Sequence, residues 1–145
     1  MTLRGQRIVL ALLFLTALST GLFATLAPHS FYEDFPTPSM HWVASDGPYN
    51  RHLIVDLGSM YLALATLAGA ALFRPALARV AGLVLLVFSV PHFLYHTAHL
   101  DLYGTRDKIL NEAGLLAVVL LAALLCVPRD RWAASRTPAV SSRAR

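Results

Sequence analysis

Cysteine is nearly absent from this chain, which has a single one, Cys126, among its 145 residues. One cysteine excludes an intrachain disulfide and any metal site built from several cysteines. The redox compartment of the protein therefore cannot be inferred from its cysteine content.

Charge is scarce as well. Charged residues make up 14% of the chain, whereas ordinary soluble domains carry roughly 25%. Hydrophobic residues make up 57%, and the mean hydropathy is +0.58. Eleven of the twelve basic residues are arginine, so lysine is almost missing. This preference for arginine, together with abundant Ala, Leu and Val, suggests a GC-rich bacterial genome. The composition indicates an integral membrane protein.

Sequence signatures of the common enzyme classes are missing too. The chain has no glycine-rich phosphate loop and no Gly-x-Ser-x-Gly elbow. It also contains no internal repeat of the kind that secondary transporters use. The sequence therefore leaves open whether the protein is an enzyme.

Long apolar runs are what the chain does have. A membrane span needs about 20 mostly apolar residues, and four stretches are long enough: residues 8–27, 53–73, 76–97 and 109–127. The sequence predicts an all-α fold, a four-transmembrane-helix bundle over residues 1–128. Residues 129–145 are polar and rich in Arg, Ser and Pro, which predicts a disordered basic cytoplasmic tail.

The first apolar run has an alternative interpretation as a cleaved signal peptide, because Arg4 and Arg7 precede it and small residues lie near Ala27. Its apolar length exceeds the 7 to 15 residues, roughly, of a signal-peptide core. We therefore favour a retained span. Either interpretation leaves the C-terminus on the same side of the membrane.

Arginine is distributed unevenly between the two predicted sides. With four membrane crossings, both termini and the turn between the second and third spans lie on the same side of the membrane. Nine of the twelve basic residues lie on that side, together with a single acidic residue, Asp130. The other side holds three basic and seven acidic residues. Basic loops remain in the cytoplasm, so we predict both termini inside a bacterial cytoplasmic membrane. The pI near 9.7 follows from this topology and requires no nucleic-acid partner.

The longest connection is the predicted outer loop, residues 28–52, which is rich in Pro, Gly and aromatic residues. Loops longer than about 12–15 residues are often functional. The aromatic residues also suit the interface between lipid and water. The loop is predicted to be either a lid over the outer end of the bundle or a membrane-surface anchor.

Three histidines occur in PHFLYHTAHL, residues 91–100, at the outer end of the third span. At 100° per residue, His92, His96 and His99 share one helix face, with Tyr95 nearby. Pro91 lacks a backbone N–H, so a bend is expected beneath them. The histidines thus form a polar stripe near the outer surface.

A carboxylate is expected opposite this stripe. Asp56 lies about one turn inside the second span, where an ionised carboxylate costs about 2.5–3.5 kcal/mol unless it finds a partner. A third-span histidine is the expected partner. His52 lies four residues before Asp56, and Asn111 and Glu112 enter the fourth span at the same depth.

Two stretches of the chain, YNRHLIVDLGSMYLALA and VFSVPHFLYHTAHLD, resemble small uncharacterised four-helix membrane proteins of GC-rich bacteria, which are loosely DoxX-like in architecture. The resemblance implies four spans and points to Asp56, Gly58 and the three histidines as family positions. It brings no settled activity. A link to membrane oxidoreductase assemblies is implied by analogy alone.

These observations predict an outward-facing site between the second, third and fourth spans. Its primary residues are Asp56, His92, His96 and His99, and its secondary residues are His52, Glu112, Tyr95 and Asn111. Imidazoles on successive turns with a carboxylate can ligate Zn, Cu or non-haem Fe. A haem would need axial ligands that face each other from two helices, and a small ligand is a further possibility.

The competing hypothesis is a non-catalytic accessory or assembly subunit of a membrane complex, in which the histidines hold the helices together by hydrogen bonds. Besides the lipid bilayer, the predicted partners are then a membrane protein or a second copy of the chain. A metal site predicts that His96 and His99 turn toward Asp56. Packing alone has no such requirement.

Overall fold

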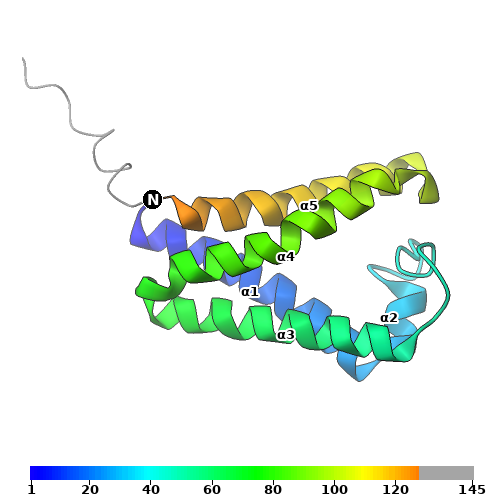
Figure 1. The fold of residues 1–145 in the computed structure, drawn as a ribbon, viewed down its shortest axis with the longest axis horizontal. Helices are drawn as coiled ribbons and strands as arrows, with labels where there is room; N and C mark the ends of the chain where they lie inside the picture. Colours follow the sequence, from blue (N-terminus) through cyan, green and yellow to red (C-terminus); the bar gives the residue numbers. More distant parts are fainter. Residues whose placement is uncertain (128–145) are drawn as a thin grey trace, which may run out of the picture.

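The computed structural model describes residues 1–127, and 81% of them are helical, with no strand in that part of the chain. Five α-helices and two short 3-10 helices follow one another as shown in Figure 1. In chain order they are α1 (Leu3–Leu26), α2 (Pro28–Asp34), α3 (Arg51–Phe73), η1 (Pro75–Leu77), α4 (Ala78–Ala98), η2 (Leu100–Leu102) and α5 (Thr105–Cys126).

The all-α class and the four predicted apolar helices are confirmed. The helices α1, α3 and α5 and the continuous segment Pro75–Ala98 are each long and apolar enough to cross a membrane. Within the predicted outer loop the structure has a helix that the sequence analysis did not predict, α2. The predicted tail, residues 129–145, lies outside the described residues, as does residue 128.

Helix ends in this chain follow from local chemistry. The Thr2 side chain accepts a hydrogen bond from the Gly5 amide, and the Asn50 side chain accepts one from the Leu53 amide, so α1 and α3 begin with capping residues. Pro28 starts α2 and Pro75 starts η1, where the missing N–H of proline costs no helical hydrogen bond. Pro91 lies within α4, which continues through it to Ala98.

The four long helices pack as two close pairs, α1 with α3 and α4 with α5, and the contacts between the pairs are fewer. Small residues allow each close approach. A Cβ on Gly58 would come within 2.9 Å of the Ala24 Cβ, and a Cβ on Gly82 within 2.9 Å of the Ala122 carbonyl oxygen. Glycine is required at both crossings because any side chain would push the paired helices apart.

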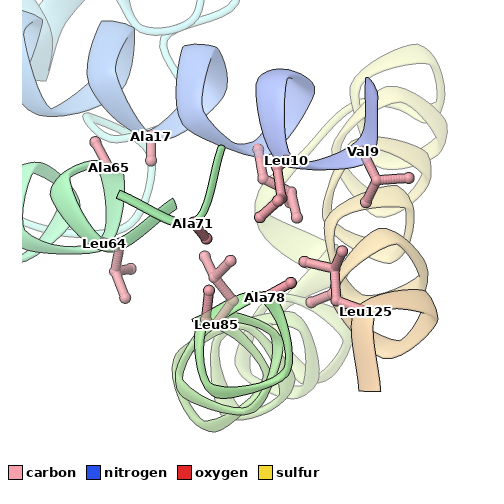
Figure 2. Packing of buried hydrophobic residues seen from close by; sticks show 12 residues of the cluster. Val9, Leu10, Ala17, Leu64, Ala65, Ala71, Ala78, Leu85 and Leu125 are labelled. Carbon is pink, nitrogen blue, oxygen red and sulfur yellow. The ribbon is translucent and has the colours of Figure 1, made fainter. Parts of the chain in front are cut away.

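One buried apolar cluster joins the two pairs (Figure 2). Its residues come from all four long helices, and many of them are alanine or leucine: Val9, Leu10, Leu13, Ala17, Leu64, Ala65, Ala71, Ala78, Ala81, Leu85, Ala122 and Leu125. The cluster occupies the half of the bundle that contains the α3–α4 turn. A second cluster, Ala24, Phe31 and Ile54, anchors α2 to α1 and α3 at the opposite end.

At that opposite end, α2 and the segment that follows it lie between the two helix pairs (Figure 1). This segment, residues 35–50, is called the cap loop below. It begins with a cis Phe35–Pro36 peptide bond. The Tyr32 hydroxyl donates a hydrogen bond of 2.9 Å to the Gly47 carbonyl, which ties the cap loop to α2.

Replacing Gly82 with alanine is expected to destabilise the fold by about 1–3 kcal/mol, because the new methyl group overpacks the α4–α5 crossing. Thermal unfolding in detergent should show a lower midpoint. Gly114→Ala is the matched control, since a Cβ there meets nothing within 4 Å and alanine favours the helix. Equal midpoints for the two variants would contradict the close packing at Gly82.

Candidate ligand-binding cavity

A cavity of about 300 Å³ lies between the two helix pairs. Its walls come from α1, α3, α4 and α5, and α2 and the cap loop contribute Phe31, Phe35, Trp42, Val43 and Asp46. The helices run antiparallel, so Leu13, Leu64 and Leu85 line the end nearest the apolar cluster. Thr20, Leu57, His96 and Asn111 line the end nearest the cap loop.

Several polar groups in this lining lack a hydrogen-bond partner in the protein. The Trp42 Nε1, the Ser89 Oγ and the Asn111 Oδ1 atoms are buried and have no partner among the described residues. Ser89 and Asn111 are each only 4% exposed. A buried polar group without a partner typically costs about 1–3 kcal/mol. Three such groups around one cavity therefore mark a place where a polar atom is needed.

The histidine stripe is divided between the cavity and the surface. His92 and His96 line the cavity, whereas His99 does not. The His92 ring lies between the Phe88 and His96 rings, with centroid distances of 5.4 Å and 4.8 Å. The His96 Nδ1 lies 3.3 Å from the Tyr103 hydroxyl. The His99 Nδ1 instead contacts the Tyr95 carbonyl of its own helix at 2.7 Å, which is a local packing role.

Asp56 does not face the histidine stripe, which corrects the sequence analysis. Its carboxylate lies 3.2 Å from His52 Nε2 on the same helix, and its side chain is 61% exposed. Neither residue lines the cavity. The expectation failed because Asp56 lies on the exposed surface of α3, where His52 of the same helix is its ion-pair partner.

Asp46 of the cap loop supplies the carboxylate that the sequence analysis had assigned to Asp56. Its Oδ1 accepts a hydrogen bond of 3.0 Å from the Tyr95 hydroxyl, and the residue lines the cavity. The sequence analysis did not single out Asp46, nor did it assign Trp42 to the site. The length and aromatic content of this loop were the only signal, and they do not indicate which loop residues turn inward.

The two residues predicted on the fourth span have different roles. Asn111 lines the cavity, whereas Glu112 does not. The Glu112 Oε2 accepts a hydrogen bond of 2.9 Å from the Thr97 hydroxyl and so connects α4 to α5. The other oxygen of the carboxyl group, Oε1, is buried and has no partner in residues 1–127.

No metal-ligand set occurs in the part of the chain that the structure describes. No group of three or more His, Cys, Asp or Glu side chains there could hold a metal ion. His92 and His96 are adjacent, but Asp56 lies elsewhere and His99 turns to its own helix. The predicted Zn, Cu, Fe or haem centre therefore gains no support from the geometry.

Comparisons of the chain with protein-family models, with curated proteins and with solved structures found no match. The resemblance to DoxX-like membrane proteins stays a prediction.

Tyr103, between η2 and α5, connects the cap loop to the histidine stripe. Its hydroxyl lies 3.4 Å from the Trp42 carbonyl oxygen, to which it can donate, and 3.3 Å from His96 Nδ1. Burial, followed by the negative charge of Asp46 and then by Tyr95, raises the pKa of Tyr103 from 10.0 to about 12. The hydroxyl therefore remains a donor at any physiological pH.

This raised pKa predicts how stability depends on pH. From about pH 10 to 12 the unfolded chain loses the Tyr103 proton while the folded chain retains it. The native state then binds more protons, so the free energy of unfolding falls as the pH rises. The Tyr103→Phe variant should lose less stability over this range, as measured by denaturant unfolding at about pH 9 and about pH 11. Equal losses in the two proteins would contradict the raised pKa.

The hydrogen bond between Tyr95 and Asp46 is expected to hold the cap loop against α4. Tyr95→Phe should increase amide hydrogen exchange in residues 35–50 by up to about tenfold, because a typical hydrogen bond contributes about 0.5–1.5 kcal/mol. Tyr49→Phe is the control, since the Tyr49 ring has aromatic neighbours while its hydroxyl forms no hydrogen bond with any described residue. If both variants left exchange in the loop unchanged, this role of Tyr95 would be wrong.

Proposed function

We propose that this chain is a multi-pass membrane protein that binds a small molecule in an outward-facing cavity between its two helix pairs. The observation that carries the proposal is the cavity itself. It has about 300 Å³ of space, and three buried polar atoms in its lining lack partners in the described chain. Ligand sites in proteins are typically apolar cavities of roughly this size or larger with a few convergent polar groups.

The apolar outer surface supports membrane insertion. Ile8, Leu15, Val87 and Leu120 are each more than half exposed, and they come from three different helices. Exposed apolar area on this scale is uncommon in soluble monomers. Lipid is the environment that would cover it.

Charge supports the orientation with both termini in the cytoplasm. Arg4, Arg7, Arg74 and Arg79 lie at the end of the bundle that contains the α3–α4 turn. The acidic cap loop, with Asp46, lies at the other end. By the positive-inside rule the arginines are cytoplasmic, and in a bacterium the membrane would be the cytoplasmic membrane.

The accessory-subunit alternative predicted from the sequence rests on histidines that act in packing. His99 and His52 have local partners on their own helices and fit that role. His92 does not fit that role, because its ring stacks on Phe88 and meets the His96 ring edge to face, and it forms no hydrogen bond within residues 1–127. A ring nitrogen free to bind a guest favours the ligand site over packing alone.

Cysteine labelling tests the topology. In a Cys126→Ala background, Ser39→Cys in the cap loop should react with a membrane-impermeant maleimide on intact cells. Ala76→Cys, in the α3–α4 turn, should react only after the cells are permeabilised. The opposite pattern would reverse the orientation, and labelling of both sites on intact cells would contradict the four-span topology.

Quenching of Trp42 fluorescence tests the cavity. Trp132→Phe leaves Trp42 as the single tryptophan, and 1-bromoadamantane serves as a compact apolar quencher in lipid nanodiscs. We expect saturable quenching. Gly114→Leu should abolish the saturable component, because Gly114 lines the cavity and its Cβ position is open.

Ala117→Leu, on the exposed side of α5, is the matched control and should leave the quenching unchanged. Thermal unfolding of both variants checks that they fold. Quenching that grows linearly with probe concentration in every variant would reflect partition into lipid alone. That result would overturn the proposed function.

A further inference from the structure

We infer that the ligand is a neutral molecule with a compact apolar body and a carbonyl-type oxygen that accepts hydrogen bonds near the middle of the cavity. This inference rests on the proposed function. It goes further because it specifies the charge, the polar group and the orientation of the guest.

The charge of the guest follows from the lining. Among the described residues no arginine or lysine lines the cavity, so an anionic guest would find no fixed cation there. The single carboxylate in the lining, Asp46, lies in the exposed cap loop and already accepts the Tyr95 hydroxyl. A charge in an apolar site without a close partner is strongly disfavoured. A neutral guest is therefore the one that these walls accommodate.

The polar group of the guest follows from what the unpartnered side chains can do. The Trp42 Nε1 carries a proton and can only donate, and its nitrogen is buried without an acceptor. The Ser89 hydroxyl can also donate, and it is buried in the same lining. The unpartnered atom of Asn111 is Oδ1, which can only accept. The Tyr61 hydroxyl also has no hydrogen-bond partner in the described chain and lines the cavity from α3.

The three donors, Trp42 Nε1, the Ser89 hydroxyl and the Tyr61 hydroxyl, come from the cap loop, α4 and α3. Their shared need is an acceptor. A carbonyl oxygen has two lone pairs and could accept from two of the donors at once, whereas a hydrocarbon would leave all of them unsatisfied. A neutral imidazole at His92 adds one donor and one acceptor to the same region.

The orientation follows from the two ends of the cavity. Leu13, Leu64, Leu85 and Val118 line the inner end, which is apolar. The polar groups lie in the middle and toward the cap loop. The apolar body of the guest therefore points toward the cytoplasmic half of the bundle, and its oxygen points outward. A volume of about 300 Å³ lies at the small end of the range for ligand sites, which favours a compact ring system over a long-chain lipid.

The test uses one apolar skeleton with four different substituents. Adamantane, 2-adamantanone, adamantane-1-carboxylate and 1-adamantylammonium compete with 1-bromoadamantane for the full-length Trp132→Phe protein in nanodiscs. We expect 2-adamantanone to bind about three- to tenfold more tightly than adamantane, as one or two neutral hydrogen bonds predict. The two ions should compete more weakly than the ketone.

Variants show whether the preference comes from the lining. Ser89→Ala and Tyr61→Phe each remove one donor from the lining. Both should reduce the ratio of ketone to hydrocarbon affinity toward one, with little change in the affinity for adamantane. Ser59→Ala is the matched control, because it removes a serine hydroxyl from the exposed side of α3, where that hydroxyl donates to the Val55 carbonyl.

Each outcome decides a different statement. If no member of the series competes and 1-bromoadamantane itself does not saturate, the proposed function fails. If 1-bromoadamantane saturates but adamantane competes as well as the ketone, the cavity binds guests and the inferred polar group is wrong. Stronger competition by the carboxylate or the ammonium compound would instead overturn the inferred neutrality. A ketone preference that survives both Ser89→Ala and Tyr61→Phe would contradict the role of those donors.

Discussion

Close contact between paired helices is the constraint on which the rest of this structure depends. Gly58 allows α3 to lie against Ala24 of α1, and Gly82 allows α4 to lie against Ala122 of α5. Because each pair is held so tightly, the two pairs form separate layers. Leucines and alanines fill the space between the layers at one end of the bundle, and toward the other end a cavity remains, lined in part by α2 and the cap loop.

The cap loop is positioned by polar contacts to three tyrosines from different parts of the chain. Tyr32 of α2 bonds to Gly47, Tyr95 of α4 bonds to Asp46, and Tyr103 contacts the Trp42 carbonyl. Tyrosine suits this place because its ring packs against apolar surface while its hydroxyl reaches a partner. The same contacts bring Trp42 into the lining of the cavity, so the geometry of the candidate site depends on the loop.

The sequence was sufficient to predict the helical class and the four apolar helices, because each run is long and nearly uncharged. It also placed His92 and His96 on one face, since helical periodicity alone determines that relation. Asn111 was named as a secondary site residue on the basis of depth along its helix, and the structure places it in the cavity lining.

The part of the site that lies in the loop could not be predicted in the same way. Nothing local in residues 35–50 determines that Asp46 meets Tyr95, because that contact depends on how α2 turns the chain between the helix pairs. The prediction that Asp56 faces the histidine stripe failed for a related reason. The depth of a residue along a helix does not determine which neighbouring helix its side chain faces. His52, four residues away, satisfies Asp56 locally.

The placement of the cavity between two pre-formed layers has a thermodynamic consequence. A molecule in that space contacts α1 and α3 on one side and α4 and α5 on the other, so it adds to the interface that is otherwise the less extensive one. Occupancy of the cavity and association of the two layers are therefore linked. A guest that binds only the assembled state stabilises that state, by a free energy that grows with the logarithm of the guest concentration above its dissociation constant. In this bundle the guest would act as part of the core.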